Sequence, residues 1–506
     1  MGGVCSRKRD QLEIEDGLHR GVSGRFCKSG SSKWLATTFS RPVVEIQRGK
    51  GKCPSLMELC IYKIREDINN YGSFSMLPRD LSQQIFNELV NSQCLTDVSL
   101  EAFRDCALQD LYLGDYPGVN NNWMDVISSQ GSSLLVLDLS SSDVTDSGLI
   151  YLKDCAHLQA LNLNYCDQIS NCGLQHISGL SNLTSLSFRR NSVITAQGMS
   201  TFSCLVNLLK LDLEKCPGIH GGLVHIKGLT KLESLNIKWC NCITDVDMKA
   251  LSGLTNLKSL QISCTKVTDF GITYLKGLQK LSILNLEGCP VTASCLDSLS
   301  VLASLLYLNL SRCNFSDDGC EKFFKLGNLK VLNLGFNDIS DSSLIHMKGL
   351  TNLESLNLDS CRIGDDGLVH LSGLQRLKCL ELSDTEVGSN GLRHLSDFKN
   401  LRSLEICGGG LTDAGVKNVK DLSSLSLLNL SQNCNLTNKA LEMISGLTGL
   451  VSLNVSNSRI TSAGLRHLKP LKNLRSLNLE SCKVTSNDIK KLQSSHLHHL
   501  VNFRPE

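Results

Sequence analysis

Large aromatic side chains are scarce in this sequence. Only 5% of its 506 residues are Phe, Trp or Tyr, although 41% are hydrophobic. A chain of this length can hold several domains, but its interior must be packed mainly by small aliphatic side chains.

An excess of charge of one sign is also missing. Lys and Arg number 51 against 49 Asp and Glu, which gives a formal net charge of +2. Nucleic-acid binders and polyanion carriers usually show a strong basic excess. The composition therefore predicts no nucleic-acid partner.

Long uncharged apolar runs are absent as well. No stretch reaches the roughly 18 apolar residues that a membrane span requires, and the polar start MGGVCSRKRD lacks the apolar segment of a secretory signal peptide. We therefore expect a cytoplasmic protein. In that reducing compartment the 23 cysteines are not expected to form disulfides, so packing, hydrogen bonds, metal binding or acylation must explain them.

The sequence is rich in one repeated pattern, L-x-x-L-x-L, which recurs every 24 or 25 residues. Such a period predicts one short strand and one return helix per copy. With a degenerate first copy at Leu108, Leu111 and Leu113, the chain has about 15–16 repeats. The first leucines of the regular copies are Leu134, Leu158, Leu183, Leu208, Leu232, Leu257, Leu281, Leu305, Leu329, Leu353, Leu377, Leu401, Leu425, Leu450 and Leu474.

Within one copy, strand leucines such as Leu356 and Leu358 alternate inward. The following segment, RIGDDGLVHLSGL, supplies a turn, capping aspartates and apolar residues at helical spacing. One copy cannot bury its own leucines, but stacked copies can. The predicted fold is an α/β solenoid, with a curved parallel sheet on its concave side, helices on its convex side, and a short helical N-terminal cap.

A hydrogen-bond donor occupies the corner three residues after the last strand leucine in nearly every copy. A residue there turns under the strand and can satisfy backbone carbonyls left bare at the end of the sheet. We predict this role for Cys166, Cys216, Cys240, Cys289, Cys313, Cys361 and Cys482. Cys240 and Cys242 form a pair that would suit zinc, but no second pair has the required spacing. We therefore predict no metal.

The stretches LNLNYCDQISNCGLQHISGL and LNIKWCNCITDVDMKALSGL resemble the cysteine-containing class of leucine-rich repeats, whose superhelix is of the ribonuclease-inhibitor type. The resemblance covers residues 134–506 and implies a binding surface without catalysis or cofactors. A histidine recurs in the pattern GL-x-H, with Ser in place of Gly before His346, which indicates a repeat consensus rather than a catalytic base. These histidines are His176, His225, His346, His370, His394 and His467.

A cluster of basic and aromatic residues marks a candidate binding surface. The side chains around the last two strand leucines point out of the concave wall, and equivalent positions in neighbouring repeats lie about 5 Å apart. Arg and Trp are enriched at interface hot spots, so we predict that a protein substrate binds here. Neutralisation of the cations by Asp212 and Glu214 remains the alternative. The predicted site comprises Tyr165, Arg189, Arg190, Lys210, Lys215, Lys238 and Trp239.

The N-terminus, MGGVCS, matches the motif for myristoylation of Gly2, and Cys5 occupies a frequent palmitoylation position. One myristoyl chain binds a membrane only marginally, so a second lipid or the basic residues that follow would be needed. The motif predicts attachment to the inner face of the plasma membrane through acylation alone. The alternative is that residues 1–52, rich in Gly, Ser, Lys and Arg, are only a flexible leader.

Residues 53–107 carry two apolar stripes at helical spacing, followed by CLTDVSLEAFRDC. The simplest interpretation is a helical cap that covers the first repeat of a domain spanning residues 108–506. The first stripe contains Leu56, Leu59, Cys60 and Ile64. The second contains Leu77, Pro78, Leu81, Ile85, Phe86 and Leu89.

These stripes also resemble two adaptor-binding motifs. L-P-x-D-L-x-x-x-I-F-x-x-L is similar to the opening of an F-box, and S-L-x-x-L-C-x-x-x-I is similar to a BC-box. The resemblance implies that the stripes bind a Skp-type or elongin-C-type adaptor. The chain would then be the substrate-recognition subunit of a cullin-type (SCF-like) E3 ubiquitin ligase in protein degradation. The alternative is a lipid-anchored signalling or defence scaffold without a ligase role.

Overall fold

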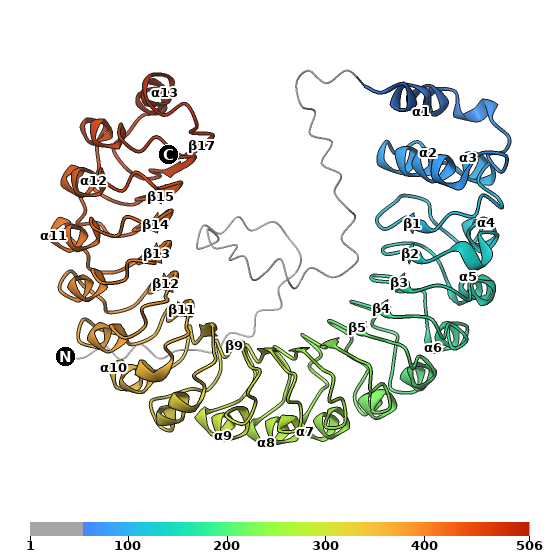
Figure 1. Ribbon diagram of the computed structural model, residues 1–506, viewed down its shortest axis with the longest axis horizontal. Helices are drawn as coiled ribbons and strands as arrows, with labels where there is room; N and C mark the ends of the chain where they lie inside the picture. Colours follow the sequence, from blue (N-terminus) through green and yellow to red (C-terminus); the bar gives the residue numbers. More distant parts are fainter. Residues whose placement is uncertain (1–53, 505–506) are drawn as a thin grey trace, which may run out of the picture. The chain divides into compact units, whose positions relative to one another are not determined.

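A computed structural model describes residues 54–504 of the chain, which belong to one compact unit beginning at Cys53. The unit is a curved solenoid in which strands line the inner side and helices cover the outer side (Figure 1). Each period supplies one strand and one helical return. The fold class predicted from the leucine period is therefore confirmed.

The sheet contains 17 parallel strands of three residues each, and every strand pairs with its neighbours in chain order. The strands are β1 Asp110–Tyr112, β2 Val136–Asp138, β3 Ala160–Asn162, β4 Ser185–Ser187, β5 Lys210–Asp212, β6 Ser234–Asn236, β7 Ser259–Gln261, β8 Ile283–Asn285, β9 Tyr307–Asn309, β10 Val331–Asn333, β11 Ser355–Asn357, β12 Cys379–Glu381, β13 Ser403–Glu405, β14 Leu427–Asn429, β15 Ser452–Asn454, β16 Ser476–Asn478 and β17 Asn502–Arg504.

The central residue of each strand forms a ladder of buried side chains through the solenoid. Leu308 of β9, for example, pairs with Leu284 of β8 and Leu332 of β10. The ladder runs from Leu111 to Leu477 and ends with Phe503. Its leucines belong to one continuous core, and full burial of each contributes about 1.5–3 kcal/mol. The strand leucines therefore share one dry interior.

The returns are helical but shorter than an ordinary helix. Between β1 and β16 no single helical element exceeds seven residues, and many are 3-10 turns. The α-helices are α1 Leu56–Glu66, α2 Arg79–Asn91, α3 Asp97–Glu101, α4 Trp123–Ser128, α5 Asp146–Leu149, α6 Asn171–Gln175, α7 Asp245–Met248, α8 Asp269–Ile272, α9 Leu296–Leu299, α10 Asp341–Leu344, α11 Asp413–Val416, α12 Asn438–Ile444 and α13 Ser486–Ser495. The 3-10 helices are η2 Ile68–Asn70, η3 Gly131–Ser133, η4 Ile150–Asp154, η5 Gly198–Cys204, η6 Gly222–Ile226, η7 Lys249–Leu251, η8 Thr273–Leu275, η9 Ala293–Cys295, η10 Cys320–Lys325, η11 Ile345–Gly349, η12 Gly367–Leu371, η13 Gly391–Leu395, η14 Lys417–Val419 and η15 Ser462–Leu468. The six recurring histidines lie in these returns and are half-buried.

Aspartates at the starts of several returns connect one repeat to the next. The carboxylate of Asp245 accepts hydrogen bonds from the backbone N–H and the hydroxyl of Thr268, at 2.7 and 2.6 Å. Asp317 binds Ser340 in the same way. The approach is close: a Cβ atom at Gly271 would lie 2.4 Å from Oδ1 of Asp245. Glycine therefore allows the cap of one repeat to reach the next.

The corner cysteines form a second ladder, as predicted. The thiol of Cys166 donates to the carbonyl of Leu139 at 3.2 Å, and Cys216 and Cys240 donate to the carbonyls of Phe188 and Leu213 at 3.1 Å. Burial raises the pKa of the Cys216 thiol to about 12, so this sulfur is not a nucleophile at neutral pH. Within residues 54–504 no cluster of side chains is suited to a metal ion.

The cap closes the first edge of the sheet. The side chain of Gln83 in α2 accepts from the backbone N–H groups of Gln109 and Asp110, and donates to the carbonyl of Asp110 at 2.7 Å. One amide side chain thus takes the place of a neighbouring strand on β1. No helix in the described part of the chain is long and apolar enough to cross a membrane.

Candidate functional site

The residue three positions after the end of each strand from β2 to β16 has a left-handed backbone. We call this series the left-handed row, and its φ angles lie between 54° and 71°. A residue with a Cβ atom loses about 1 kcal/mol or more in this conformation, so large side chains here are not favoured by the backbone. The row is Ser141, Tyr165, Arg190, Lys215, Trp239, Cys264, Gly288, Arg312, Phe336, Ser360, Asp384, Gly408, Gln432, Asn457 and Ser481.

Three exposed aromatic rings stand in this row. Tyr165, Trp239 and Phe336 expose 46%, 49% and 47% of their surface. Each ring is contacted by a cation from a neighbouring repeat. The distances to the ring centroids are 5.3 Å for Arg190 over Tyr165, 5.7 Å for Lys215 over Trp239 and 3.8 Å for Arg312 over Phe336. Such pairs stabilise by about 0.5–1 kcal/mol at exposed sites and hold both partners in place.

The structure brings most of the predicted basic-aromatic cluster together, with one member in a different role. Arg189 is already paired within the chain. Its guanidinium binds the carboxylate of Asp212 at 2.7 Å and lies 3.8 Å from Glu214. Burial alone would lower the pKa of Arg189, but the hydrogen bond to Asp212 raises it. For Arg189, the alternative of neutralisation by Asp212 and Glu214 is therefore confirmed. Lys210 is exposed, and Lys238 and Lys215 are half-buried.

Arg312 and Phe336 are a cation–aromatic pair that the sequence analysis missed. They occupy the same two positions as Lys215 and Trp239, in repeats further along the chain. The signal was present in the sequence, because Phe336 occupies the same position in its repeat as Trp239. The cationic and aromatic part of the wall thus extends from β3 to β10.

A second missed feature is an acidic region at β11 to β13. Asp359 follows β11, Glu381 lies on the neighbouring strand β12, and Glu405 lies on β13, which pairs with β12. Burial, and then the charge of Glu405, raise the pKa of Asp359 to about 6. Asn357 donates hydrogen bonds to both Asp359 and Glu381. The wall therefore changes from cationic to anionic between β10 and β11.

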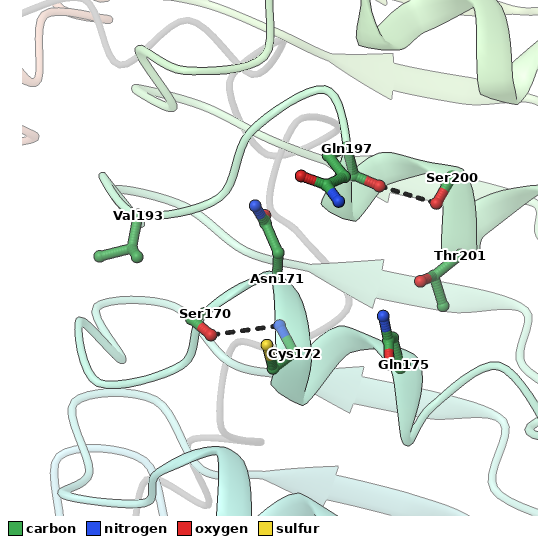
Figure 2. A pocket seen from close by; sticks show the side chains of 8 residues that line it. All are labelled: Ser170, Asn171, Cys172, Gln175, Val193, Gln197, Ser200 and Thr201. Atoms are coloured by element: carbon green, nitrogen blue, oxygen red, sulfur yellow. Dashed lines mark hydrogen bonds between the residues drawn. The ribbon is translucent and has the colours of Figure 1, made fainter.

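The outer side carries a shallow pocket of about 310 Å³ near α6 and η5. In Figure 2, the Ser200 hydroxyl donates to the carbonyl of Gln197, and the Cys172 N–H donates to the Ser170 hydroxyl. No charged side chain or histidine lines the pocket, so it lacks the acid and base that catalysis requires. The concave wall is the stronger candidate site.

The residues predicted to bind an adaptor fall into two groups. Leu56, Leu59, Cys60, Leu77 and Pro78 are exposed, and Ile64 and Leu81 are half-buried. Ile85, Phe86 and Leu89, by contrast, are at most 3% exposed.

Burial removes this second group from the predicted adaptor surface, because these side chains fill the interior of the cap. The ring of Phe86 packs edge-on against Phe103 at 5.3 Å. Gly2 and Cys5, predicted to be acylated, lie outside the described residues.

Comparison with known proteins identifies the repeats. Family models described as leucine-rich repeats match residues 225–291, 303–363 and 399–460 for one model, and 132–153 and 154–178 for another. No curated protein matches the sequence.

Solved structures show the same architecture at low sequence identity. A leucine-rich repeat protein of Leptospira interrogans is 21% identical with a TM-score of 0.53, over 73% of this chain and 95% of its own. The mouse RP105/MD-1 complex gives 19% identity and a TM-score of 0.54, over 79% of each chain. At these identities the likeness establishes the fold alone.

Proposed function

We propose that this leucine-rich repeat protein is the substrate-recognition subunit of a cullin-type ubiquitin ligase. In this function the exposed stripe of the cap binds the adaptor, the concave wall binds the protein to be degraded, and the ubiquitin chemistry belongs to other subunits. The fold is typically a protein-binding scaffold, which supports the non-catalytic role.

The observation that carries the proposal is the unburied apolar surface of α1. This helix has no buried residue, and Leu56 and Leu59 expose 78% and 48% of their surface. Met76 and Leu77, just before α2, expose 93% and 37%. Ile61 and Ile64 of α1 pack against the core, but Leu56 and Leu59 do not, although a helix needed only as a cover has no use for outward-facing leucines. Outward-facing apolar residues of this size are typical of a docking surface.

A variant with Leu56→Asp and Leu59→Asp tests the adaptor contact. We expect it to lose co-purification with both elongin-C-type and Skp-type adaptors when each is co-expressed with its cullin. The melting temperature should change by no more than about 2 °C, because exposed substitutions alter stability by only about 0.5 kcal/mol. Val98→Asp is the matched control, since Val98 lies in the same cap and is 74% exposed.

Three results would decide against the ligase role. They are failure of the unaltered chain to bind either adaptor, retention of the adaptor by the double variant, and equal loss with Val98→Asp. If the unaltered chain binds no adaptor, the signalling or defence scaffold becomes the better description. The cap would then serve only to cover Leu111 and the first edge of the sheet.

We also propose that the chain is acylated at Gly2 and Cys5 and attached to the inner face of the plasma membrane. Gly2→Ala removes the myristoylation site and should move most of the protein from the membrane fraction to the soluble fraction. Cys5→Ser should give partial release, because one lipid and the basic residues Arg7, Lys8 and Arg9 remain. Identical partitioning of the Gly2→Ala variant and the unaltered chain would contradict acylation.

A further inference from the structure

Most strands end in the same local hydrogen bond. The last strand residue is Asp or Asn, and its side-chain oxygen accepts from the backbone N–H two residues later, at 2.8–3.2 Å. This bond satisfies a donor at the point where the chain leaves the sheet. The residues that accept it are Asp138, Asn162, Asp212, Asn236, Asn285, Asn309, Asn333, Asn357, Asn429, Asn454 and Asn478.

Gln261 departs from this pattern at the end of β7. It lies in register between Asn236 and Asn285, but its longer side chain does not accept the usual bond. Its Oε1 atom and the Oγ atom of Ser263 are buried without a hydrogen-bond partner among residues 54–504. The two residues are only 4% and 1% exposed. An unsatisfied buried polar group costs about 1–3 kcal/mol, so a structural role alone does not explain glutamine here.

The left-handed row changes character beside these two residues. Trp239 comes first, and its backbone N–H donates to the carbonyl of Ser263 at 2.9 Å. Cys264 follows with a short side chain, Gly288 has none, and Arg312 comes next with a long one. The Trp239 ring and the Arg312 cation thus lie on either side of Cys264 and Gly288, where the wall has little side-chain volume.

The charges around this stretch are mainly positive. Cys264 lies within electrostatic reach of Lys238, Arg312 and Glu287, and Lys215 lies over the Trp239 ring. Within residues 54–504, Lys215, Lys238 and Arg312 form no ion pair. Glu214 is also near, but it accepts a hydrogen bond from Asn236 and lies 3.8 Å from Arg189. Three cations against the two carboxylates Glu214 and Glu287 favour an acidic ligand.

We propose that this stretch of wall binds an extended acidic peptide segment of a partner protein. We call it the β7 patch, and it consists of Trp239, Gln261, Ser263, Cys264, Gly288 and Arg312. A peptide N–H of the partner donates to Oε1 of Gln261, and the Ser263 hydroxyl donates to a peptide carbonyl. The inference rests on the proposed role of the concave wall and specifies the chemistry of its ligand.

The dimensions and the hydrogen-bonding groups fit such a peptide. Trp239 and Arg312 are three strands apart, about 14 Å at the usual strand spacing, which about four extended residues span. A peptide backbone offers both the donor and the acceptor that the two orphan oxygens require. Neither oxygen has an internal hydrogen bond to break, and turning the Gln261 amide toward a ligand gives up only the long 3.5 Å bond from its Nε2 atom to the Ser259 hydroxyl. Glu287 and the single row of cations disfavour a phosphate backbone.

Gln261→Asn separates binding from folding, because it restores the residue found at most strand ends. Acidic peptides selected from a random-sequence phage display library on the immobilised full chain serve as the probe. One selected peptide is then synthesised and titrated. We expect Gln261→Asn to weaken its binding at least tenfold without lowering the melting temperature. Asn454→Gln, the reverse change on β15, is the matched control and should leave the affinity unchanged.

A series of peptides N-methylated at single positions tests the donor directly. Methylation at one peptide nitrogen should weaken binding to the unaltered chain tenfold. The same methylation should have little further effect on binding to the Gln261→Asn variant, because the peptide N–H and Oε1 of Gln261 are the two partners of one hydrogen bond. The inference is overturned by affinities for the two chains within twofold, by failure to select any peptide, or by preferential binding of a single-stranded RNA octamer. The adaptor experiment is unaffected by these results, so the two proposals fail separately.

Discussion

Replacing Leu308 with alanine is expected to lower the free energy of unfolding by about 2–5 kcal/mol, the usual range for a buried leucine. Leu308 is completely buried and packs between Leu284 and Leu332 at the middle of the solenoid. Because each repeat contacts only its neighbours, the cavity also uncouples the repeats on either side of β9. Urea denaturation followed by circular dichroism should therefore show an earlier and broader transition.

Leu306→Ala is the control for this experiment. Leu306 lies two residues earlier in the same repeat but exposes 38% of its surface. Its truncation should change the free energy of unfolding by less than about 1 kcal/mol. Equal losses at Leu306 and Leu308 would contradict a single dry interior formed by the central strand residues.

Asp359→Asn is expected to stabilise the protein at neutral and higher pH but not at acidic pH. Burial raises the pKa of Asp359 from 3.8 to about 6. The group therefore supports folding fully below pH 3.8, and this support is lost as the pH rises through about 6. Asparagine keeps an oxygen for the Ser383 N–H, which donates to Asp359 at 2.7 Å, and carries no charge.

The measurement is the free energy of unfolding of both chains at pH 4 and pH 8. From pH 4 to pH 8, the free energy of unfolding of the variant should rise by about 1–3 kcal/mol relative to that of the unaltered chain. Asp421→Asn changes an exposed carboxylate and should show little such shift. If the stability of the variant relative to the unaltered chain is the same at pH 8 as at pH 4, or lower, then the charged form of Asp359 does not destabilise the fold.

The sequence predicted the strands well because their determinant is a period. The inward positions of Leu356 and Leu358 follow from alternation in a strand, and both side chains are fully buried. The corner cysteines were also predictable, because carbonyls at the end of a sheet need donors and Cys166 and Cys240 recur where such donors must lie. The leucine and corner-donor pattern of one repeat is a weak indication of structure, but its recurrence along the chain makes the prediction strong.

Features that depend on the partner of a single side chain were not predictable. The sequence placed Arg189 among the free cations, but only the geometry shows that Asp212 reaches it. It placed Phe86 on an adaptor surface, because an apolar stripe at helical spacing indicates a face without showing what covers it. The left-handed backbone at Trp239 could not be predicted from its own repeat, because tryptophan is not typical of that conformation.

The two hydrogen-bonded ladders restrict how the length of this chain can change. Cys166 and the buried Ile169 are three residues apart, whereas Ser142 and the buried Val144 of the previous repeat are two apart. The additional residue of that 25-residue period thus lies just after the corner, between one ladder and the next. The chain also changes length at the start of one return, where the buried Ile219 and Leu223 are four residues apart, whereas Val144 and Leu149 are five apart. An insertion within a strand would shift leucines and corner donors out of alignment together. Relatives of this protein should therefore differ in length by whole periods, or by single residues between the corner and the return.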